Sequence, residues 1–566
     1  MNCSIRFKLT TVALLVGSAM NANAALYKVV EVDPALNGSS STYNDAYGVA
    51  IQQGDVAFET GCFANGANCT DDKFKLALET RVSVDGVSYR EELPFAMDAT
   101  FGYIQEFDDF ERYCYNELRY STCETWASIH WAPWYKELSK DYTSNALAFV
   151  ERDPDAGEEE PNAYQNKYNN VINSLTSSGL PVGNQSVLKD DKTDLETRNT
   201  VVAPVTPQGD FYQSRAWKTD GTYTVGSVSS KTGNENGTHY TSKAAIWDAA
   251  GAVKQLDWPQ GGDRDGERLA QGSMRDMVVD TAKNIVYGVG YNTFADDNYI
   301  NASVFVGTFD AGGALKDSTW QSKQVSGAQM KISGDIIHSN SVVTNVNSNF
   351  VAIGEAKRAG GKPSEGSAAN RLFLVKDVRA ESVSATFLPE LGGIFFSGAG
   401  GKMGGINKYN EIVGQLDAED TREIDGKPRR KRAFILPYEA NGSVESRRSI
   451  FDNKAWYLDD LTNGSNAPVE NNQYRVIDAT DINDAGVISA TAIKCEGGYD
   501  TTAHNSYCGE GSKEETVVAV KLIPIANADA NDIEKRPVEK AAAERSGAGL
   551  GWLSLTLLVL FGFRRK

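Results

Sequence analysis

The residues with the most definite chemistry are cysteines. Apart from Cys3 near the N-terminus, they form three close pairs: Cys62 with Cys69, Cys114 with Cys123, and Cys495 with Cys508. Six cysteines in local pairs are typical of disulfides in an exported protein. Zinc is disfavoured, because no pair has the two-residue gap of a zinc knuckle and the chain contains only 4 histidines. We therefore predict three local disulfides and no metal site.

Signatures of catalysis are scarce. The chain has no Gly-x-Ser-x-Gly nucleophile motif and no His-Glu-x-x-His zinc helix. His130 stands among tryptophans in WASIHWAPWYKEL, residues 126–138, where exposed rings could stack on sugars, but we favour a core role for these rings. Carboxylates are abundant, yet the separation that a glycosidase needs cannot be derived from a sequence. We assign no catalytic residue and no cofactor-binding residue.

Three charged or glycine-rich segments have simple structural interpretations. GGIFFSGAGGKMGG, residues 392–405, is not a phosphate loop, because Met403 stands where Ser or Thr is needed; we expect strands and turns near the centre of a β-propeller. ERDPDAGEEEP, residues 151–161, is expected to be a solvated loop, with Ca²⁺ binding as the alternative. KPRRKR, residues 427–432, is expected to be a solvated loop tip, with contact to a surface polysaccharide as the alternative.

The N-terminus has the pattern of a secretory signal peptide. Arg6 and Lys8 precede an apolar run over residues 9–20, and a small-residue cleavage site ends at Ala24. We expect residues 1–24 to be removed between Ala24 and Ala25. The mature protein is therefore predicted to be exported.

The C-terminus has the pattern of a membrane-spanning segment. A polar linker, residues 527–546, precedes GAGLGWLSLTLLVLFGFRRK, residues 547–566, in which the apolar run ends in three cations. Its length is at the lower edge of what spans a bilayer, and the cations place the C-terminus in the cytoplasm. We predict a transmembrane helix there, with the body of the protein outside.

This tail resembles the GlyGly-CTERM sorting tail of Gram-negative bacteria, in which small residues precede a leucine-rich span and a basic end. The tail here has Gly547 and Ala548 where the family usually has two glycines. The resemblance implies processing near these two residues by a rhombosortase, an intramembrane protease. It also implies passage through the type II secretion machinery to the outer cell surface or the medium.

Composition narrows the classes of partner. The formal net charge is −19, which disfavours nucleic acid and anionic lipid as ligands. With 41% hydrophobic and 10% aromatic residues, the chain can bury a large core. The body is therefore expected to be a folded, acidic protein.

An internal repeat indicates the fold. Segments such as WKTDGTYTVG, VNSNFVAIG and INKYNEIVG each combine a strand, a polar turn and a second strand that ends in a small residue. These units end at Gly226, Gly288, Gly354, Gly414 and Ala490, and a weaker copy occupies residues 49–59. An apolar strand follows each unit. Such spacing predicts an all-β, propeller-like body over residues 25–526 with about six modules.

Two further expectations concern the path of the polypeptide. The strand over residues 26–32 is expected to complete the last blade and close the ring. Residues 60–200 are expected to be an irregular insertion that carries two of the cysteine pairs. Within it, the spacing of Tyr168, Val171 and Leu175 predicts a helix over residues 164–179.

The units resemble extracellular HAF repeats, in which an Ile-Asn turn precedes a His-Ala-Phe strand; the corresponding strand here contains Arg432-Ala433-Phe434. The whole arrangement resembles a family of secreted gammaproteobacterial proteins of unknown function. We predict a non-enzymatic, surface-displayed or released protein that binds an extracellular ligand or polysaccharide. The alternative is a secreted carbohydrate-active enzyme that uses paired carboxylates.

Overall fold

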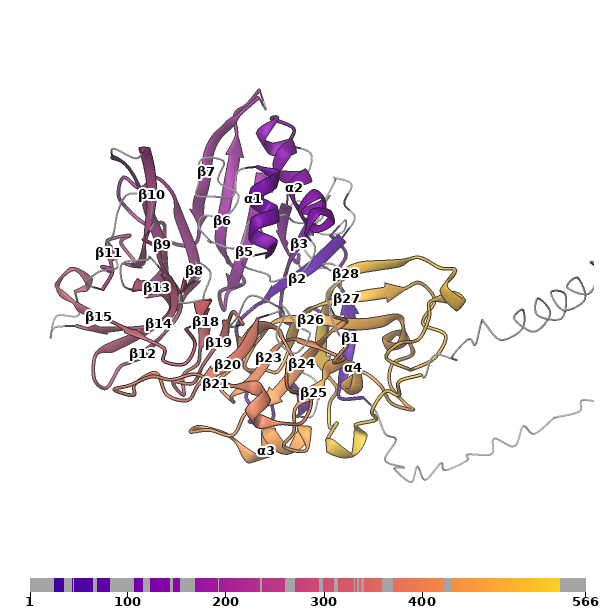
Figure 1. Ribbon diagram of the computed structural model, residues 1–566. Helices are drawn as coiled ribbons and strands as arrows, with labels where there is room; N and C mark the ends of the chain where they lie inside the picture. Colours follow the sequence, from indigo (N-terminus) through magenta and orange to yellow (C-terminus); the bar gives the residue numbers. More distant parts are fainter. Residues whose placement is uncertain are drawn as a thin grey trace, which may run out of the picture.

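The structure is a computed structural model of the protein. It describes residues 25–34, 43, 45–64, 69–81, 106–115, 123–142, 146–152, 168–191, 193–234, 237–259, 270–294, 299–309, 314–329, 331–332, 335–336, 341–358, 370–421 and 429–539. Within these ranges the polypeptide forms antiparallel sheets arranged around a centre, as in a β-propeller (Figure 1).

Seven blades make up the propeller, numbered here in sequence order. Blade 1 contains β2 (Asp45–Ile51), β3 (Leu76–Arg81) and β4 (Ala146–Val150), and blade 2 contains β5 (Tyr168–Leu175), β6 (Pro181–Leu188) and β7 (Leu195–Val202). Blade 3 contains β8 (Ser214–Thr219), β9 (Tyr223–Asn234), β10 (Gly237–Asp248) and β11 (Val253–Gln255). Blade 4 contains β12 (Gly272–Asp280), β13 (Ile285–Phe294), β14 (Tyr299–Thr308) and β15 (Thr319–Gln324).

The remaining blades lie in the C-terminal half. Blade 5 contains β18 (Ser341–Val346), β19 (Ala352–Ala356), β20 (Arg371–Val375) and β21 (Thr386–Phe387), and blade 6 contains β22 (Gly401–Ile406), β23 (Glu411–Asp417), β24 (Lys431–Pro437) and β25 (Trp456–Tyr457). Blade 7 contains β26 (Tyr474–Ile482), β27 (Ile488–Cys495), β28 (Glu515–Pro524) and the N-terminal strand β1 (Tyr27–Glu31). A separate hairpin joins β16 (Lys331–Ile332) to β17 (Asp335–Ile336).

Helices are short and few within the described residues. They are α1 (Phe107–Tyr113), α2 (Glu124–Leu138), α3 (Glu445–Arg448) and α4 (Leu458–Leu461), with 3-10 turns at Gly61–Phe63, Leu315–Asp317, Leu388–Leu391, Ser449–Phe451, Val469–Gln473, Gly509–Gly511 and Ala530–Asp532. None of the helices in the described ranges is long and apolar enough to cross a membrane. The predicted transmembrane helix at 547–566 and the signal peptide at 1–24 lie outside the described residues.

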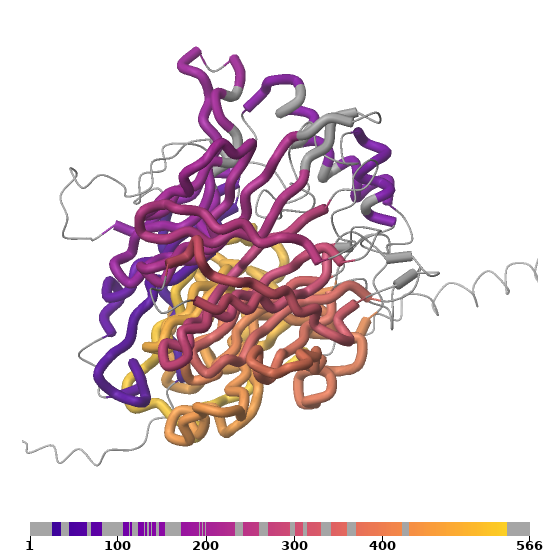
Figure 2. The backbone as a smooth tube through the Cα atoms, turned by 90° about the vertical axis from the view of Figure 1, so that its left-hand side faces the viewer, coloured from indigo at the N-terminus to yellow at the C-terminus, as the bar shows by residue number. Residues whose placement is uncertain are grey.

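The ring closes as the sequence predicted. β1 pairs antiparallel with β28, with Tyr27 opposite Pro524 and Glu31 opposite Val520. Figure 2 shows the result, because the indigo N-terminal strands lie against the yellow C-terminal strands. The pairing of β1 with β28, which lie near opposite ends of the described region, thereby closes the ring. The prediction of an all-β, propeller-like body is confirmed.

The predicted number of about six modules is wrong, because the structure has seven blades. The missed blade is blade 2, and the helix predicted over residues 164–179 is instead the strand β5. Its pairing with β6 shifts between Tyr168 and Val171 and again between Ile172 and Ser174. These irregularities break the two-residue alternation of a strand and leave apolar residues three and four apart, which imitates a helix.

Residues 60–200 are thus more than an insertion. They supply β3 and β4, which complete blade 1, and all of blade 2 except the last two residues of β7. The helices α1 and α2 lie in the connection between β3 and β4. The weaker repeat at residues 49–59 begins in β2, but a long connection separates β2 from its partner β3.

Polar turns join neighbouring blades. The side-chain oxygen of Asn347 accepts a hydrogen bond from its own hairpin, at the backbone N of Val351 (3.1 Å), and its Nδ2 donates to the carbonyl of Asn407 in the next blade (2.9 Å). Asn407 Nδ2 donates to the carbonyl of Asn483 (3.1 Å), and Asn483 Nδ2 donates to the carbonyl of Gln52 (3.0 Å). The asparagine of the repeat therefore links blades 5, 6, 7 and 1, which gives the Ile-Asn turn a structural role.

Candidate functional site: the central channel

A cavity of about 470 Å³ lies at the centre of the propeller. The first strand of each blade contacts the first strand of the next, and the contacts form a closed ring of β2, β5, β8, β12, β18, β22 and β26. Residues from all seven of these strands line the cavity, which we call the central channel. Because every blade contributes to the lining, the channel contains more side chains, and more kinds of side chain, than one blade could supply.

A β-bulge in each first strand faces this channel. The pairing of the first strand with the second skips one residue or more in every blade. A bulge re-aims a side chain that regular pairing would place elsewhere. At least one skipped residue of every first strand lines the channel: Val49, Asn173, Trp217, Arg275, Thr344, Gly404, Ile477 and Thr480.

The small residue that ends several repeat units makes room for the bulge. A Cβ atom on Gly226 would lie 1.8 Å from the carbonyl oxygen of Arg215, beside the bulge at Trp217. Gly414 is equally confined, because its Cβ would lie 2.4 Å from the carbonyl oxygen of Lys402. Real Cβ atoms do not approach a carbonyl so closely. The repeated glycine is therefore required by the geometry that shapes the channel.

The channel reaches the face on which the second and third strands of each blade are joined. Three of its lining residues stand at the ends of such strands: Arg81 is the last residue of β3, Lys357 follows the last residue of β19, and Asn370 precedes the first residue of β20. These residues form part of a mouth on that face, which a ligand from solution could enter.

Charged groups of both signs line the channel. The cations are Arg81, Lys218, Arg275, Lys357 and Lys402, and the carboxylates are Glu355, Asp478 and Asp481. Burial raises the pKa of both Asp478 and Asp481 to about 6. The channel therefore contains two carboxyl groups that exchange protons near neutral pH.

Asp478 and Asp481 have different surroundings. Lys402 and Arg81 lower the pKa of Asp478 while Glu355 raises it, but burial has the largest effect. Asp481 accepts hydrogen bonds from the backbone N of Ile51 (3.1 Å) and from Nε2 of Gln53 (3.1 Å). Asp481 thus joins blade 7 to blade 1 as well as lining the channel.

Two further carboxylates are fixed by direct bonds. Oε1 of Glu355 accepts a hydrogen bond from the backbone N of Met403 (2.8 Å), and Oε2 accepts one from Nδ2 of Asn370 (2.9 Å). Behind the lining, Asp276 pairs with Lys218 (3.1 Å) and accepts a bond from the backbone N of Val346 (3.1 Å). These bonds hold polar groups on three blades in defined positions.

The aromatic residues of the channel are covered by arginines. The guanidinium carbon of Arg275 lies 3.5 Å from the ring centre of Trp217 and 5.3 Å from that of Tyr291. The guanidinium carbon of Arg81 lies 4.3 Å from the ring centre of Tyr47. Such contacts combine cation–π attraction with stacking, and they restrict the orientation of each guanidinium.

The three predicted disulfides are present, and none of their cysteines is among the residues that line the channel. Cys62–Cys69 lies in the connection between β2 and β3, Cys114–Cys123 joins the end of α1 to the start of α2, and Cys495–Cys508 closes the loop between β27 and β28. Their role is therefore to close surface connections. His130 lies in α2, and its side chain is not among the described parts of that helix.

The segment 392–405 lies where the sequence predicted, because Lys402, Met403 and Gly404 line the channel. Most of the acidic stretch 151–161 is outside the described residues, so the Ca²⁺ alternative there stays a prediction. Within the part of the protein that the structure describes, no group of three His, Cys, Asp or Glu residues is placed to hold a metal ion.

Sequence reasoning missed the channel residues, although a pattern marks them. In six blades the bulge residue stands three positions before the residue that begins the first turn, as Thr344 stands before Asn347 and Thr480 before Asn483. Only blade 4 departs from this spacing, since Arg275 is five positions before Asp280. The repeat therefore marks the positions that line the channel. Whether the side chains at these positions face the channel depends on the bulges, which a sequence does not reveal.

In the described part of the basic run 427–432 only Arg430 is exposed, so the prediction of a solvated loop tip is wrong for Arg429, Lys431 and Arg432. Arg429 is buried and pairs with Asp417 (3.2 Å), and Lys431 pairs with the same carboxylate. Arg432 is buried against Asp459 (2.9 Å). Carboxylates that are distant in the sequence neutralise this run, which composition alone could not show.

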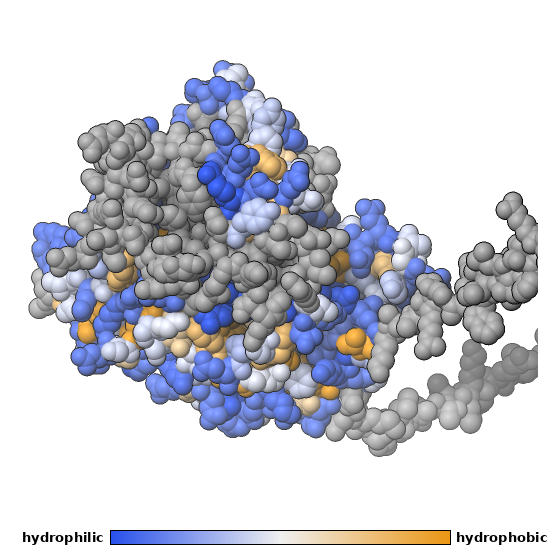
Figure 3. Space-filling view, in the orientation of Figure 1, coloured by the Kyte–Doolittle hydropathy of each residue, from blue (hydrophilic) through white to orange (hydrophobic). Residues whose placement is uncertain are grey.

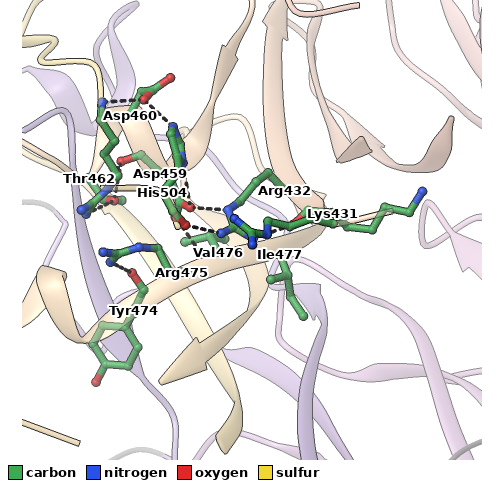
Figure 4. A network of polar contacts seen from close by, with 12 residues as sticks. Lys431, Arg432, Asp459, Asp460, Thr462, Tyr474, Arg475, Val476, Ile477 and His504 are labelled. Carbon is green, nitrogen blue, oxygen red and sulfur yellow. Dashed lines mark hydrogen bonds and ion pairs between the residues drawn. The ribbon is translucent and has the colours of Figure 1, made fainter. Parts of the chain in front are cut away.

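Asp459 belongs to a second polar cluster, which we call the C-terminal clamp: Arg432, Asp459, Asp460, Arg475, His504 and Arg536. Figure 4 labels the first five of these residues. Nε2 of His504 lies 3.0 Å from Oδ1 of Asp460. The same oxygen accepts a bond from the backbone N of Arg536 (2.8 Å), whose Nε donates to the carbonyl of Asp459 (2.7 Å). The clamp ties the C-terminal described residues to blades 6 and 7.

The charges of the clamp act on one another strongly. Burial alone would raise the pKa of Asp459, but the neighbouring His504 (3.6 Å) and the charges of Arg432 and Arg536 lower it well below its usual range. Burial alone would lower the pKa of His504, but the carboxylates of Asp459 and Asp460 beside it raise it. Each carboxylate of the clamp therefore has a direct cationic partner.

Fold and channel together define a seven-bladed β-propeller with a polar central channel. The protein belongs to the family described as "Protein of unknown function (DUF3466)", whose model matches residues 5–206 and 211–566. This agrees with the predicted membership of a family of unknown function. A comparison with curated proteins gives no match.

Solved structures show only distant likeness. The protein is similar to one component of a complex named for BT0996 and RGII, at 8% identity, with 92% of this protein and 96% of that component covered and a TM-score of 0.19. It is similar to a second structure, named "Glycoside hydrolase", with the same identity, coverage and TM-score. At this TM-score neither likeness bears on the function of the protein.

Proposed function

We propose that this protein is an exported binding protein, displayed at the cell surface or released, whose central channel holds part of a polar extracellular ligand such as a saccharide. The observation that carries the proposal is the ring of bulges. Seven independent irregularities place side chains in one channel. A propeller that needed only a filled centre could use apolar side chains there.

The lining suits a ligand rich in hydroxyl groups. Amides and hydroxyls from several blades line the channel beside the charged groups, including Asn173, Ser174, Thr344, Asn345 and Thr480. Such groups both donate and accept hydrogen bonds, as sugar hydroxyls do. Concave sites with a few placed polar groups and some aromatic surface are typical of small-molecule binding.

Export is supported by the three disulfides, which form and persist in oxidising compartments. We further propose that the signal peptide 1–24 is removed after Ala24. The tail at 547–566 is then processed near Gly547 and Ala548 by a rhombosortase before delivery by type II secretion. Mass measurement of the protein from its native host tests both cleavages.

Blocking the channel tests the binding proposal. Thr344→Trp adds an indole at a bulge inside the channel, whereas Thr319→Trp adds the same group on the exposed side of the outer strand β15. The purified proteins are applied to an array of bacterial, algal and plant polysaccharides. We expect saccharide binding by the wild type and the Thr319 variant and its loss in the Thr344 variant. Equal binding by both variants, or none by the wild type, would contradict the proposal.

A second candidate function is glycoside hydrolysis. Its specific support is Asp478, whose pKa is raised to about 6 by burial and which feels the charge of Glu355 in the same channel. A carboxyl group with a raised pKa that shares a cavity with a second carboxyl group is the usual arrangement of a glycosidase. Release of reducing ends from the array polysaccharides, abolished in Asp478→Asn, would favour this candidate.

A further inference from the structure

The arginines of the channel are arranged to meet an anion. Arg275 lies over the ring of Trp217 and Arg81 lies over the ring of Tyr47, so an aromatic ring covers one side of each guanidinium. A stacked guanidinium donates its N–H groups along its edge, the geometry that pairs with two oxygens of one carboxylate. Cations already cover these aromatic rings. A ligand would therefore interact with the channel mainly through charge and hydrogen bonds, and less through stacking on a ring.

Two lysines add to this arrangement. Lys357 is only 8% exposed and lines the channel where β19 ends, and no hydrogen bond or ion pair to another described residue satisfies it. Lys402, on β22, is exposed and lies close enough to Asp478 to lower its pKa. Both ammonium groups belong to residues that line the channel, so a ligand with a negative charge could pair with them there.

The charge of the channel differs from that of the whole protein. The lining has five cations and three carboxylates. Glu79 and Asp276 stand behind the lining and pair with Arg81 and Lys218, so that the formal charges balance locally. The whole protein has a net charge of −19. Figure 3 shows a largely hydrophilic described surface in that view. The channel is thus close to neutral in formal charge, so an anion meets less repulsion there than at the surface of this acidic protein.

We propose that the central channel recognises the carboxylate group of an acidic saccharide, that is, a uronic acid at or near the end of a polysaccharide. This inference rests on the proposed function and specifies its ligand class. Arg275 and Arg81 pair with the carboxylate oxygens, Lys357 and Lys402 add positive charge, and the amides and hydroxyls of the lining bind the sugar hydroxyls.

A matched pair of ligands tests the inference. The first is a uronic acid trisaccharide, and the second is the same trisaccharide with its carboxyl groups reduced to primary alcohols. A sulfated neutral trisaccharide is the third arm, because a sulfate ester is another source of oxyanion. Calorimetric titration into the full exported protein is expected to show binding of the first ligand at least tenfold tighter than of the other two.

Each outcome has a distinct meaning. Equal binding of the acidic and the reduced trisaccharide overturns the carboxylate inference but leaves a saccharide-binding channel. Tighter binding of the sulfated ligand overturns the carboxylate in favour of a sulfate. No binding of any of the three, together with a polysaccharide array without signal, overturns the proposed function as well.

Two substitutions separate charge from shape. Arg275→Lys keeps the charge but removes the planar edge, and we expect at least fivefold weaker binding of the acidic trisaccharide with no change for the reduced one. Lys402→Gln changes an exposed side chain and should leave folding intact, with a similar selective loss. Lys283→Gln is the matched control, since Lys283 is an exposed residue of a turn outside the channel and pairs with Asp280. Equal loss for both ligands in the first two variants would contradict the inference.

Discussion

The central channel and the C-terminal clamp contain the same kinds of residue in opposite electrostatic states. Both combine aspartates with arginine, and the channel adds lysine. In the channel, burial raises the pKa of Asp478 and Asp481 to about 6. In the clamp, His504, Arg432 and Arg536 lower the pKa of Asp459 in spite of its complete burial.

Direct pairing accounts for the difference. Asp459 has Arg432 at 2.9 Å, and its neighbour Asp460 has His504 at 3.0 Å. Asp478 is influenced by Lys402 and Arg81 but forms no ion pair within 4 Å among the described residues. Fully paired buried charges serve structure, whereas a perturbed carboxyl group in an open cavity is a mark of a functional site. The comparison therefore separates the part that holds the fold from the part that meets a ligand.

Removing a clamp carboxylate should have the largest effect. Asp459→Asn leaves Arg432 and Arg536 buried without their counter-charge, and breaking a buried pair in this way typically costs about 3–5 kcal/mol. Urea denaturation followed by fluorescence measures the loss. Asp452→Asn is the control, because Asp452 pairs with Lys454 at the surface, where such pairs contribute about 0–1 kcal/mol. Equal effects of the two substitutions would show that the clamp is not structural.

The same substitution in the channel should act in the opposite direction. Asp478 has a pKa of about 6 in the folded protein against 3.8 for an ordinary carboxyl group, so its ionisation at pH 7 opposes folding. Since one pKa unit corresponds to about 1.4 kcal/mol, Asp478→Asn should stabilise the protein by on the order of 1–3 kcal/mol at pH 7. A destabilised variant in the same urea titration would remove the contrast between channel and clamp.

The pH dependence sharpens this prediction. The unfolded protein ionises this carboxyl group near pH 3.8 and the folded protein only near pH 6, so the destabilisation is absent below about pH 4, grows between pH 4 and 6, and is constant at higher pH. The stability difference between wild type and Asp478→Asn should follow that curve. A difference that stays the same from pH 4 to pH 8 would mean that the substitution acts through packing and not through charge.

The sequence predicts the fold of this protein better than its polar sites. The repeat was enough to predict an all-β propeller and the closure of the ring by β1, because turns and apolar strands are recognisable from short stretches of sequence. Blade 2 was missed because bulges in β5 imitate helical spacing. The sorting tail and the signal peptide stay predictions.

The polar sites could not be predicted in the same way. The clamp joins Arg432, Asp459, His504 and Arg536 from separate segments, and only the closed ring brings them together. The basic run 427–432 looked solvated because its partner Asp417 stands on the neighbouring strand, 12 positions before Arg429. The channel residues come from all seven blades, so no short segment of sequence contains the site.

The smallest expected effect concerns His504, the titrating group of the clamp. Its pKa is raised by Asp459 and Asp460, so its protonated form stabilises the fold. That contribution is complete below the ordinary pKa of 6.5 and is lost as the pH rises through the raised value in the folded protein. His504→Gln keeps a hydrogen-bonding group without the charge, and we expect a loss of about 1 kcal/mol at pH 6 that shrinks as the pH rises. Urea titrations of both proteins at pH 6 and at pH 9 measure this change. A loss of equal size at both values would show that His504 contributes by packing alone, and that the charge of the clamp resides in its arginines and aspartates.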